Sequence, residues 1–247
     1  LPIPENSAAR PFVPADFTSL VTGLDADMDA TRTALTQLGD RPFAIEIRLA
    51  DLWFDINLSG TRDEGEDIAS VAGLTLGGGR MIAVPVADPV IRFDTADAAW
   101  LSAYTHFLSG FAATALAYDP EPAIQRVMDS SAAIHSLWGD TPPPNALDMM
   151  FGRQVDRVAM VLFALSKTPD RTLAMQAHGH FLAMIEDNRR LWSMVALEAD
   201  NDREWIPNDR QVSGLGFALP PETGARWQAV LADAEAVLNG EALIPHW

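Results

Sequence analysis

The chain contains no cysteine and a single lysine, Lys167, among its 17 basic residues. The absence of cysteine excludes disulfides, zinc–thiolate sites and cysteine nucleophiles. The basic residues are outnumbered by 34 acidic ones, which gives a formal net charge of −17 at pH 7. Because nucleic acids and anionic membrane surfaces both select cationic proteins, we expect neither of them as a partner.

The short motifs of common enzymes are also missing. The sequence contains neither His-Glu-x-x-His nor Gly-x-Ser-x-Gly, so it offers no metalloprotease helix and no nucleophile elbow. Three glycines at 77–79 lack the Lys-Ser/Thr that completes a phosphate-binding loop, and we interpret them as a turn. No catalytic residue is therefore assigned from a motif.

The composition is that of a folded protein. Apolar residues make up 48% of the 247 residues, enough to bury a full core. Four prolines suggest that residues 1–16 form an extended lead-in. We expect residues 17–247 to form a single helical domain, with a possible sub-boundary at the proline-rich segment 140–145.

Apolar residues recur every three or four positions over most of the chain, and this spacing predicts helices. The predicted helices cover residues 17–38, 98–118, 123–138, 145–167, 169–198 and 220–239. Two short apolar runs, 81–86 and 90–93, predict a small β-hairpin. The expected fold class is mainly α: a multi-helix bundle with a β-hairpin and one unpaired EF-hand-like calcium loop.

Residues 98–118 carry no formal charge and are long enough to invite a transmembrane interpretation. Serine, threonine and histidine interrupt this segment, and no cationic flank is present to set a membrane topology. We therefore expect a buried central helix that begins near Thr95 as its N-cap, and no membrane span.

The most informative stretch is Asp-Ile-Asn-Leu-Ser-Gly-Thr-Arg-Asp-Glu-Gly-Glu at residues 55–66. Oxygen-bearing side chains stand at its positions 1, 3, 5, 9 and 12, and Gly60 stands at position 6, where the chain must turn sharply. This pattern resembles the calcium loop of an EF-hand. The resemblance implies a Ca²⁺ ion held by Asp55, Asn57, Ser59, Asp63, Glu66 and the backbone carbonyl of Thr61.

One departure from the EF-hand pattern is Arg62, at a position that is normally aliphatic and joins paired loops. Two further runs of alternating acidic residues begin at Asp25 and Asp200. They lack the glycine and do not supply a second loop. A single loop favours a structural ion.

We expect a helix over residues 43–54 before the loop and a short helix from Ile68 after it. We expect Asp25, Asp27 and Asp29 on the solvent side of their helix.

The histidines offer a weaker hypothesis. His178 and His180 are two residues apart, so a continuous helix would point them in different directions and prevent a shared metal. His180 and Asp187 lie on one helical face, and His106 in the apolar helix could meet either of them. A buried histidine–carboxylate pair serves as a general acid and base or as a metal site, but also occurs as ordinary core packing.

Other polar and aromatic groups leave alternatives open. Four arginines suit either an anion pocket or salt bridges: Arg153, Arg157, Arg189 and Arg190. The seven tryptophans suit a carbohydrate platform or, more simply, the core. Residues 201–220 form an unusually long irregular stretch whose apolar residues should pin it to the helices.

The chain begins at Leu1 rather than Met, and we expect an exported protein from which a signal segment has been removed. An extracytoplasmic location, periplasmic or secreted, agrees with a calcium loop because free Ca²⁺ is plentiful there. Residues 93–101 and 205–211 resemble segments of uncharacterised bacterial proteins. This resemblance adds nothing about function. We therefore expect a calcium-binding module for an unknown small molecule or protein, whose groove involves residues 201–220. The alternative is a hydrolase or metal-dependent enzyme that uses His106, His180 and Asp187 or Glu186.

Overall fold

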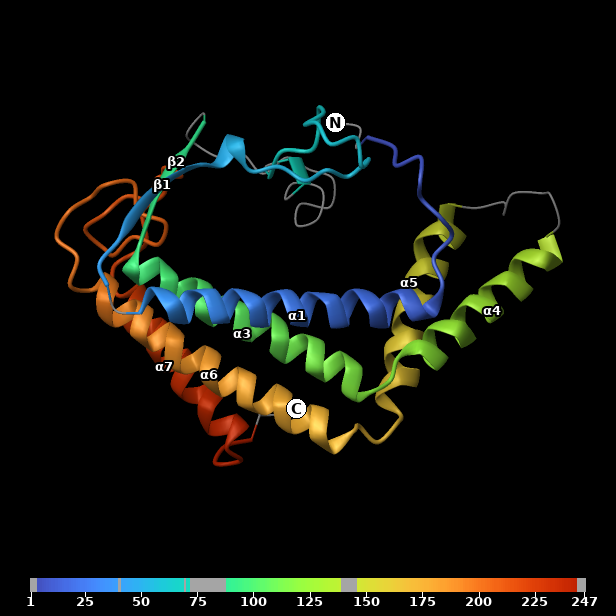
Figure 1. Cartoon of the computed structure of the whole chain (residues 1–247). Coiled ribbons are helices and arrows are strands. Elements are labelled where there is room, and N and C mark those ends of the chain that lie inside the picture. Colours follow the sequence, from blue (N-terminus) through green and yellow to red (C-terminus); the bar gives the residue numbers. More distant parts are fainter. Residues whose placement is uncertain (1–3, 40, 69, 72–87, 139–145, 244–247) are drawn as a thin grey trace. The chain divides into compact units, whose positions relative to one another are not determined.

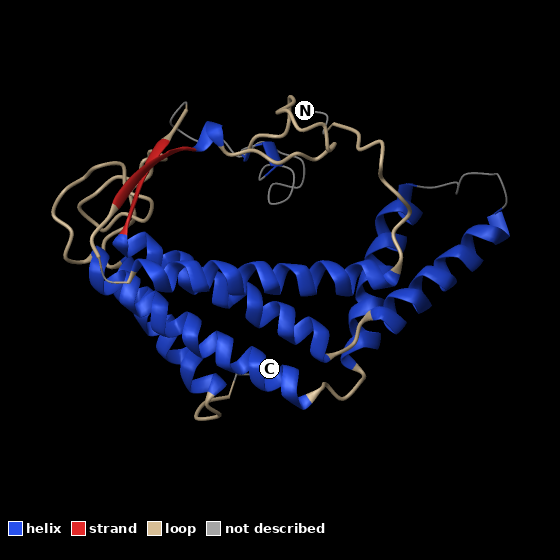
Figure 2. Ribbon diagram, in the orientation of Figure 1, coloured by secondary structure: helices blue, strands red, loops and turns tan. Residues whose placement is uncertain are grey.

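The computed structural model of the protein describes residues 4–39, 41–68, 70–71, 88–138 and 146–243 (Figure 1). Helices account for 59% of the described residues, and the strands found among these residues form one small antiparallel pair (Figure 2). The predicted fold class, mainly α with a small two-stranded β element, is confirmed.

The helices follow the predicted apolar periodicity closely. They are α1 (Pro14–Leu38), α3 (Thr95–Ala117), α4 (Glu121–Trp138), α5 (Ala146–Leu165), α6 (Arg171–Val195) and α7 (Thr223–Leu238). α6 continues through Gly179, so His178 and His180 belong to one unbroken helix. Among the described residues, no helix combines the length and apolar character needed to cross a bilayer.

The two strands are β1 (Ala44–Arg48) and β2 (Val90–Asp94), which pair antiparallel with Ile47 opposite Ile91. The strand predicted at 90–93 is present, whereas its predicted partner at 81–86 lies outside the described residues. The helix expected over 43–54 is wrong: β1 leads into a short 3₁₀ turn, Leu49–Asp51. The alternation of Phe43, Ile45 and Ile47 suits a strand once β2 supplies its hydrogen bonds.

Contacts along the chain divide it into two compact units, each assembled from separated segments. The first contains Leu1–Arg10, Leu35–Ala103 and Ile185–Trp247, and the second contains Pro11–Ala34 and Tyr104–Met184. The core of the first unit joins Ala96 and Ala99 of α3 to Leu191 and Val195 of α6. The single helical domain remains a prediction, and the possible sub-boundary at 140–145 lies outside the described residues.

Two carboxylates define the start of α3. Asp94 Oδ1 accepts the N–H of Ala96 at 2.8 Å, and Asp97 Oδ2 accepts the N–H of Asp94 at 3.0 Å. These reciprocal bonds satisfy two backbone donors that the first helical turn leaves without partners, as in a capping box. The N-cap is therefore Asp94 rather than Thr95, whose hydroxyl instead accepts the N–H of Phe43.

The uncharged sequence of α3 led us to expect a buried central helix, but α3 is not buried on all sides. Its buried face consists largely of small residues, including Ala103, Ser109 and Ala112. Phe107 and Phe111 remain 39% and 54% exposed and pack edge to face with each other. Small residues allow neighbouring backbones to approach closely, so the bulkier aromatic side chains occupy the more open face.

We expect Gly214→Ala to destabilise the protein by about 1–3 kcal/mol. A Cβ at this position would lie 2.7 Å from the carbonyl oxygen of Val90 and 2.8 Å from Ile91 Cδ1, and backbone cannot move aside cheaply. Gly23→Ala in α1 is the matched control: its Cβ meets nothing within 4 Å and should stabilise the helix by about 0.5–1 kcal/mol. Chemical denaturation of both variants measures the contrast; equal stabilities would contradict the packing described at Gly214.

Candidate functional site

Two buried side-chain amides hold residues 201–220 to the end of α6 and to the segment that follows this helix. Asn208 Nδ2 donates to the carbonyl oxygens of Val195 and Glu198, at 3.0 and 3.2 Å. Gln211 Nε2 donates to the carbonyl oxygen of Asp200, and its Oε1 accepts the N–H of Asn208 at 2.7 Å. The last carbonyls of a helix lack intrahelical donors, and Asn208 supplies one to Val195, the last residue of α6, while the other two acceptors lie in the segment that follows the helix. We call this arrangement the amide clamp.

The same stretch also pairs with β2. Arg92 N–H donates to the carbonyl oxygen of Arg203, and Gly214 N–H donates to that of Glu204. Trp205 stacks on Phe93 at a centroid distance of 5.6 Å and meets Trp100 edge to face at 5.2 Å. The two segments that the sequence singled out, 93–101 and 205–211, therefore pack together. The apolar anchoring expected of this stretch comes largely from these rings.

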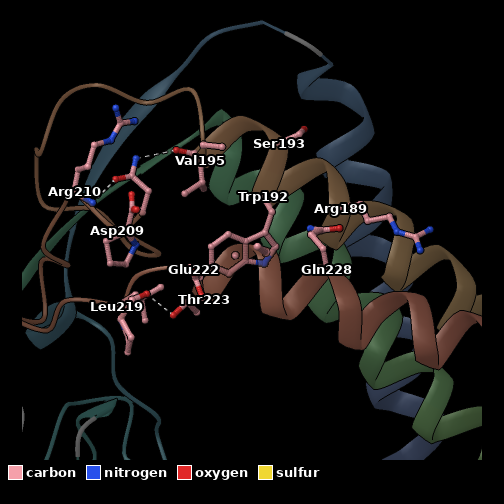
Figure 3. A pocket seen from close by; sticks show the side chains of 16 residues that line it. Arg189, Trp192, Ser193, Val195, Asp209, Arg210, Leu219, Glu222, Thr223 and Gln228 are labelled. Carbon is pink, nitrogen blue, oxygen red and sulfur yellow. Dashed lines mark hydrogen bonds between the residues drawn. The ribbon is translucent and has the colours of Figure 1, made fainter.

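A pocket with a volume of about 470 Å³ lies beside the amide clamp in the first unit (Figure 3). Its walls are α6, residues 207–210, residues 219–220 and the first turns of α7. Figure 3 shows Trp192 between Asp209 and Leu219 on one side and Arg189 and Gln228 on the other. Pockets that take small organic molecules have volumes of this order and combine apolar walls with a few polar groups.

The polar groups of the pocket are of mixed charge. Arg189 is paired with Glu235 at 2.7 Å, and Arg210 Nη2 donates to the carbonyl oxygen of Glu198 at 3.1 Å. Asp209 and Glu222 line the same pocket. The salt-bridge interpretation of Arg189 is thus correct, although the residue also lines a cavity. The lining favours a ligand with an apolar planar body and polar edges rather than a highly charged one.

A group of carboxylates lies nearby in the first unit, and we call it the acidic cluster: Asp94, Asp97, Glu198 and Glu204. Ligand atoms of Asp94, Glu198 and Glu204 lie within 4.8 Å of one another. Glu204 and Asp97 are 3% and 4% exposed. Arg92 forms ion pairs with Asp94 at 3.4 Å and with Asp202 at 3.6 Å. The acidic groups here outnumber this arginine.

Such a cluster must keep protons or attract a cation. Burial raises the pKa of Asp97 to about 7, and the charges of Asp94 and Glu204 add to the increase. Burial likewise raises the pKa of Glu198 to about 7, with further contributions from Glu204 and Asp94. The pKa of Glu204 is also raised, again mainly by burial. Asp97 and Glu198 are therefore partly protonated near neutral pH.

The predicted calcium loop is closed at its base by backbone pairing. Phe54 N–H donates to the carbonyl oxygen of Glu66 at 2.9 Å, and Trp53 forms an antiparallel bridge with Asp67. An extended segment, not a helix, therefore enters the loop. On the exit side, residues 68, 70 and 71 are helical, and Asp67 accepts hydrogen bonds from the N–H and hydroxyl of Ser70.

The predicted ligand side chains form a connected network within the loop. Asp55 accepts the N–H groups of Ser59 and Gly60, and Gly60 has the positive φ, +75°, that the sharp turn requires. Asp63 Oδ2 accepts Asn57 Nδ2 at 2.7 Å and Ser59 Oγ at 3.3 Å. The hydroxyl of Ser59 also donates to the carbonyl oxygen of Thr61.

Glu66 has a role in this loop that its sequence position did not suggest. Its side chain is fully buried, and its two oxygens accept the N–H groups of Ile56, Asn57 and Asp63. Glu66 therefore organises the loop through charge-assisted hydrogen bonds before any ion is considered. Arg62 donates to the carbonyl oxygen of Ala50 and so faces residues outside the loop.

The histidine prediction divides between the two units. In the second unit, His106 Nδ1 and His180 Nδ1 lie 2.9 Å apart. In the first unit, Asp187 accepts a hydrogen bond from Ser102 at 2.5 Å, and Glu186 is exposed. The meeting of the two histidines agrees with the expectation that His106 could lie beside His180. The inclusion of Asp187 remains a prediction.

Sequence reasoning missed the acidic cluster and one aspartate of α1. Glu204 belongs to the run of alternating acidic residues that begins at Asp200, which does not match a calcium loop. The burial of Glu204 follows from pairing with β2 rather than from any local pattern. Asp25 was expected on the solvent side, but its Oδ1 is buried and has no hydrogen-bond partner among the described residues. Asp27 and Asp29 are exposed as expected.

Comparison of the chain with models of protein families, with curated proteins and with solved structures finds no match. A function must therefore be argued from the chemistry of the sites themselves.

Replacing Glu198 with glutamine should weaken the pH dependence of stability between pH 5 and pH 8. Because the folded-state pKa of Glu198 is raised to about 7, the native protein retains a proton that the unfolded chain loses near pH 4.5. The contribution of Glu198 to stability therefore falls as pH rises through this window and is constant above it. Glu198→Gln removes that fall and can still accept the hydrogen bond of Gln211.

The measurement is the free energy of unfolding by denaturant at the two pH values, with a chelator present to exclude cations. Glu186→Gln, a change at an exposed position of α6, is the control and should leave the wild-type pH dependence intact. If wild type and Glu198→Gln lose equal stability between pH 5 and pH 8, the environment assigned to Glu198 is wrong.

Proposed function

We propose that this protein is a calcium-binding, helical ligand-binding module that takes a small organic molecule with a planar apolar body. The observation that carries the proposal is the pocket of about 470 Å³ beside the amide clamp. Its loop wall is tied to α6 by the buried amide of Asn208 and to the segment after α6 by that of Gln211, so the pocket does not depend on a ligand for its form. Such pre-organisation reduces the entropy lost on binding.

Calcium is the second part of the proposal. The loop 55–66 offers carboxylates at Asp55, Asp63 and Glu66, together with oxygens of Asn57, Ser59 and Thr61. A hard cation prefers such oxygens, six to eight of them. The backbone bridge at Trp53 and Asp67 joins the two ends of the loop, so an ion here would act as a structural staple. Calcium is abundant outside the cytosol, and we extend the proposal to an extracytoplasmic location.

The enzymatic alternative, a hydrolase or metal-dependent enzyme using His106, His180 and Asp187, is supported by one observation. This is the 2.9 Å contact between the two imidazole nitrogens, which brings together two groups that can act in acid–base chemistry or as metal ligands. Discovery of a hydrolytic activity that His106→Ala abolishes would favour this alternative over a binding module.

The fluorescent aromatic sulfonate ANS is a suitable probe of the pocket. We expect one saturable site in the native protein, and about three- to tenfold weaker binding to Trp192→Phe because the smaller ring offers less stacking area. Gly224→Ala should act similarly, since its Cβ would lie 2.9 Å from Trp192 Cε3 and displace the indole. Fluorescence titration gives the affinity, and calorimetry gives the stoichiometry.

Trp227→Phe is the matched control, because Trp227 is 43% exposed on α7 and donates to Asn188 rather than lining the pocket. It should bind the probe as wild type does. Several weak sites, or equal effects of Trp192→Phe and Trp227→Phe, would show that the probe binds exposed apolar surface and that the pocket is not a ligand site.

Calcium should raise the melting temperature of chelator-stripped protein. Calcium at about 100 times Kd stabilises the native state by about 2.7 kcal/mol, which corresponds to roughly 5–10 °C for a chain of this size. Asp63→Asn should remove most of this rise, because it deletes one of three carboxylate charges yet can still accept the Asn57 hydrogen bond. Glu66→Gln should do the same and also lower the melting temperature in EDTA, since Glu66 accepts three N–H groups.

Arg62→Ala is the control for the loop. Its side chain contacts the Ala50 carbonyl, so the calcium-induced rise should persist. The comparison uses the difference between calcium and EDTA for each variant, which separates ion binding from folding defects. An identical response of wild type and Asp63→Asn would mean that the loop is an acidic turn without an ion.

A further inference from the structure

Glu198 joins the wall of the pocket to the acidic cluster. Its carbonyl oxygen accepts hydrogen bonds from Asn208 Nδ2 at 3.2 Å and from Arg210 Nη2 at 3.1 Å, and both of these residues line the pocket (Figure 3). Its carboxylate Oε2 accepts Gln211 Nε2 at 3.2 Å. Three hydrogen bonds to one residue therefore hold the segment that forms this wall.

The carboxylate of Glu198 is at the same time a member of the acidic cluster. One carboxylate oxygen each of Asp94, Glu198 and Glu204 lies within 4.8 Å of the others. Asp97, in the first turn of α3, adds its charge to their field. Like charges at this spacing repel one another in a buried site, so the cluster cannot carry a full negative charge on every member.

The charged groups around Glu198 come from every element packed against it. The acids lie on β2, on α3 and in the segment after α6: Asp94, Asp97, Asp200, Asp202 and Glu204. Two arginines oppose them. Arg92 is paired with Asp94 and Asp202, and Arg210 contacts the carbonyl oxygen of Glu198 rather than its carboxylate. Among the described residues, negative charge therefore exceeds positive charge at this place.

The protonated form of Glu198 suits both the cluster and the clamp. Burial raises the pKa of Glu198 to about 7; the hydrogen bond from Gln211 lowers it, and neighbouring carboxylates raise it further. A protonated carboxyl keeps an oxygen that can accept from Gln211, and it gains an O–H donor among groups that otherwise only accept. Its negative charge, by contrast, adds to the repulsion within the cluster.

Glu198 is the member of the cluster that can move when its proton leaves. Asp94 is fixed at the start of α3, where it accepts an N–H of the first turn. Glu204 is 3% exposed and is paired through its backbone beside β2. Glu198 is half-buried and lies beyond the end of α6, so its side chain can turn toward solvent without unwinding the helix. That movement takes the carboxylate acceptor away from Gln211.

We propose that Glu198 couples ligand binding in the pocket to proton uptake by the acidic cluster, so that the pocket binds its ligand more tightly at pH 6 than at pH 8. This inference rests on the ligand-binding function proposed above. The closed amide clamp both retains the proton and forms the pocket wall, so a ligand that selects the closed clamp also selects the proton. Because the pKa of Glu198 is raised in the closed clamp, affinity falls as pH rises through about 7.

The test measures ANS affinity by fluorescence titration at pH 6 and pH 8, with a chelator present to exclude cations. The sulfonate of ANS stays ionised at both values, so the probe itself does not titrate. We expect about three- to tenfold weaker binding to wild type at pH 8, since one linked proton changes affinity by at most about tenfold per pH unit. Glu198→Gln should bind equally at both pH values, because it keeps an acceptor for Gln211 and cannot titrate.

Two controls isolate the coupling. Glu186→Gln, at an exposed position of α6, should keep the wild-type pH dependence. The uncharged probe N-phenyl-1-naphthylamine should show the same pH dependence as ANS, which separates a change in the pocket wall from simple repulsion of an anion. In ligand-free protein, the side-chain amide resonances of Gln211 should shift between pH 6 and pH 8 in wild type and stay unchanged in Glu198→Gln.

The possible failures are distinguishable. One saturable ANS site with equal affinity at the two pH values would overturn the coupling and leave the ligand-binding function standing. Equal pH dependence in wild type and Glu198→Gln, or Gln211 amide resonances that do not respond to pH, would also overturn it. The absence of a saturable site at either pH would refute the proposed function and the coupling together.

Discussion

The amide clamp is the interaction on which the first unit depends. Asn208 donates to the carbonyl oxygen of Val195, the last residue of α6, and Gln211 donates to that of Asp200 in the segment that follows the helix. One set of hydrogen bonds thus terminates a helix and orders a long loop. The pocket wall at residues 207–210 is a direct consequence, because the clamp holds those residues against α6.

A net charge of −17 makes the placement of carboxylates the second constraint on this protein. The structure accommodates buried acids in different ways. Glu66 and the pair Asp94–Asp97 accept backbone N–H groups, which stabilise a carboxylate within a turn or at a helix start. Asp97 and Glu198 are partly protonated near neutral pH, because burial and neighbouring carboxylates raise their pKa values to about 7, and burial also raises the pKa of Glu204. The acidic character is therefore tolerated inside the first unit without a matching number of arginines.

The three candidate ligand sites differ in how they are built. The loop 55–66 is local: its network of hydrogen bonds joins residues no more than ten positions apart. The pocket and the histidine pair are assembled from distant segments, and His106 and His180 are 74 residues apart. A local site tolerates change elsewhere in the chain, whereas the pocket and the histidine pair require that whole helices pack in one register.

The sequence by itself determined the helices and the turn of the loop 55–66. Apolar spacing of three or four residues sets a helical face without reference to the rest of the chain, and Gly60 meets a backbone requirement within its own loop. Other features needed tertiary structure. β1 became a strand because β2 supplied its partners, and Glu204 became buried because its backbone pairs beside β2. Asp25 left the expected solvent side because its helix packs with others. The physical reason is that local patterns fix backbone conformation, while burial, pKa and the meeting of side chains depend on which distant segments come into contact.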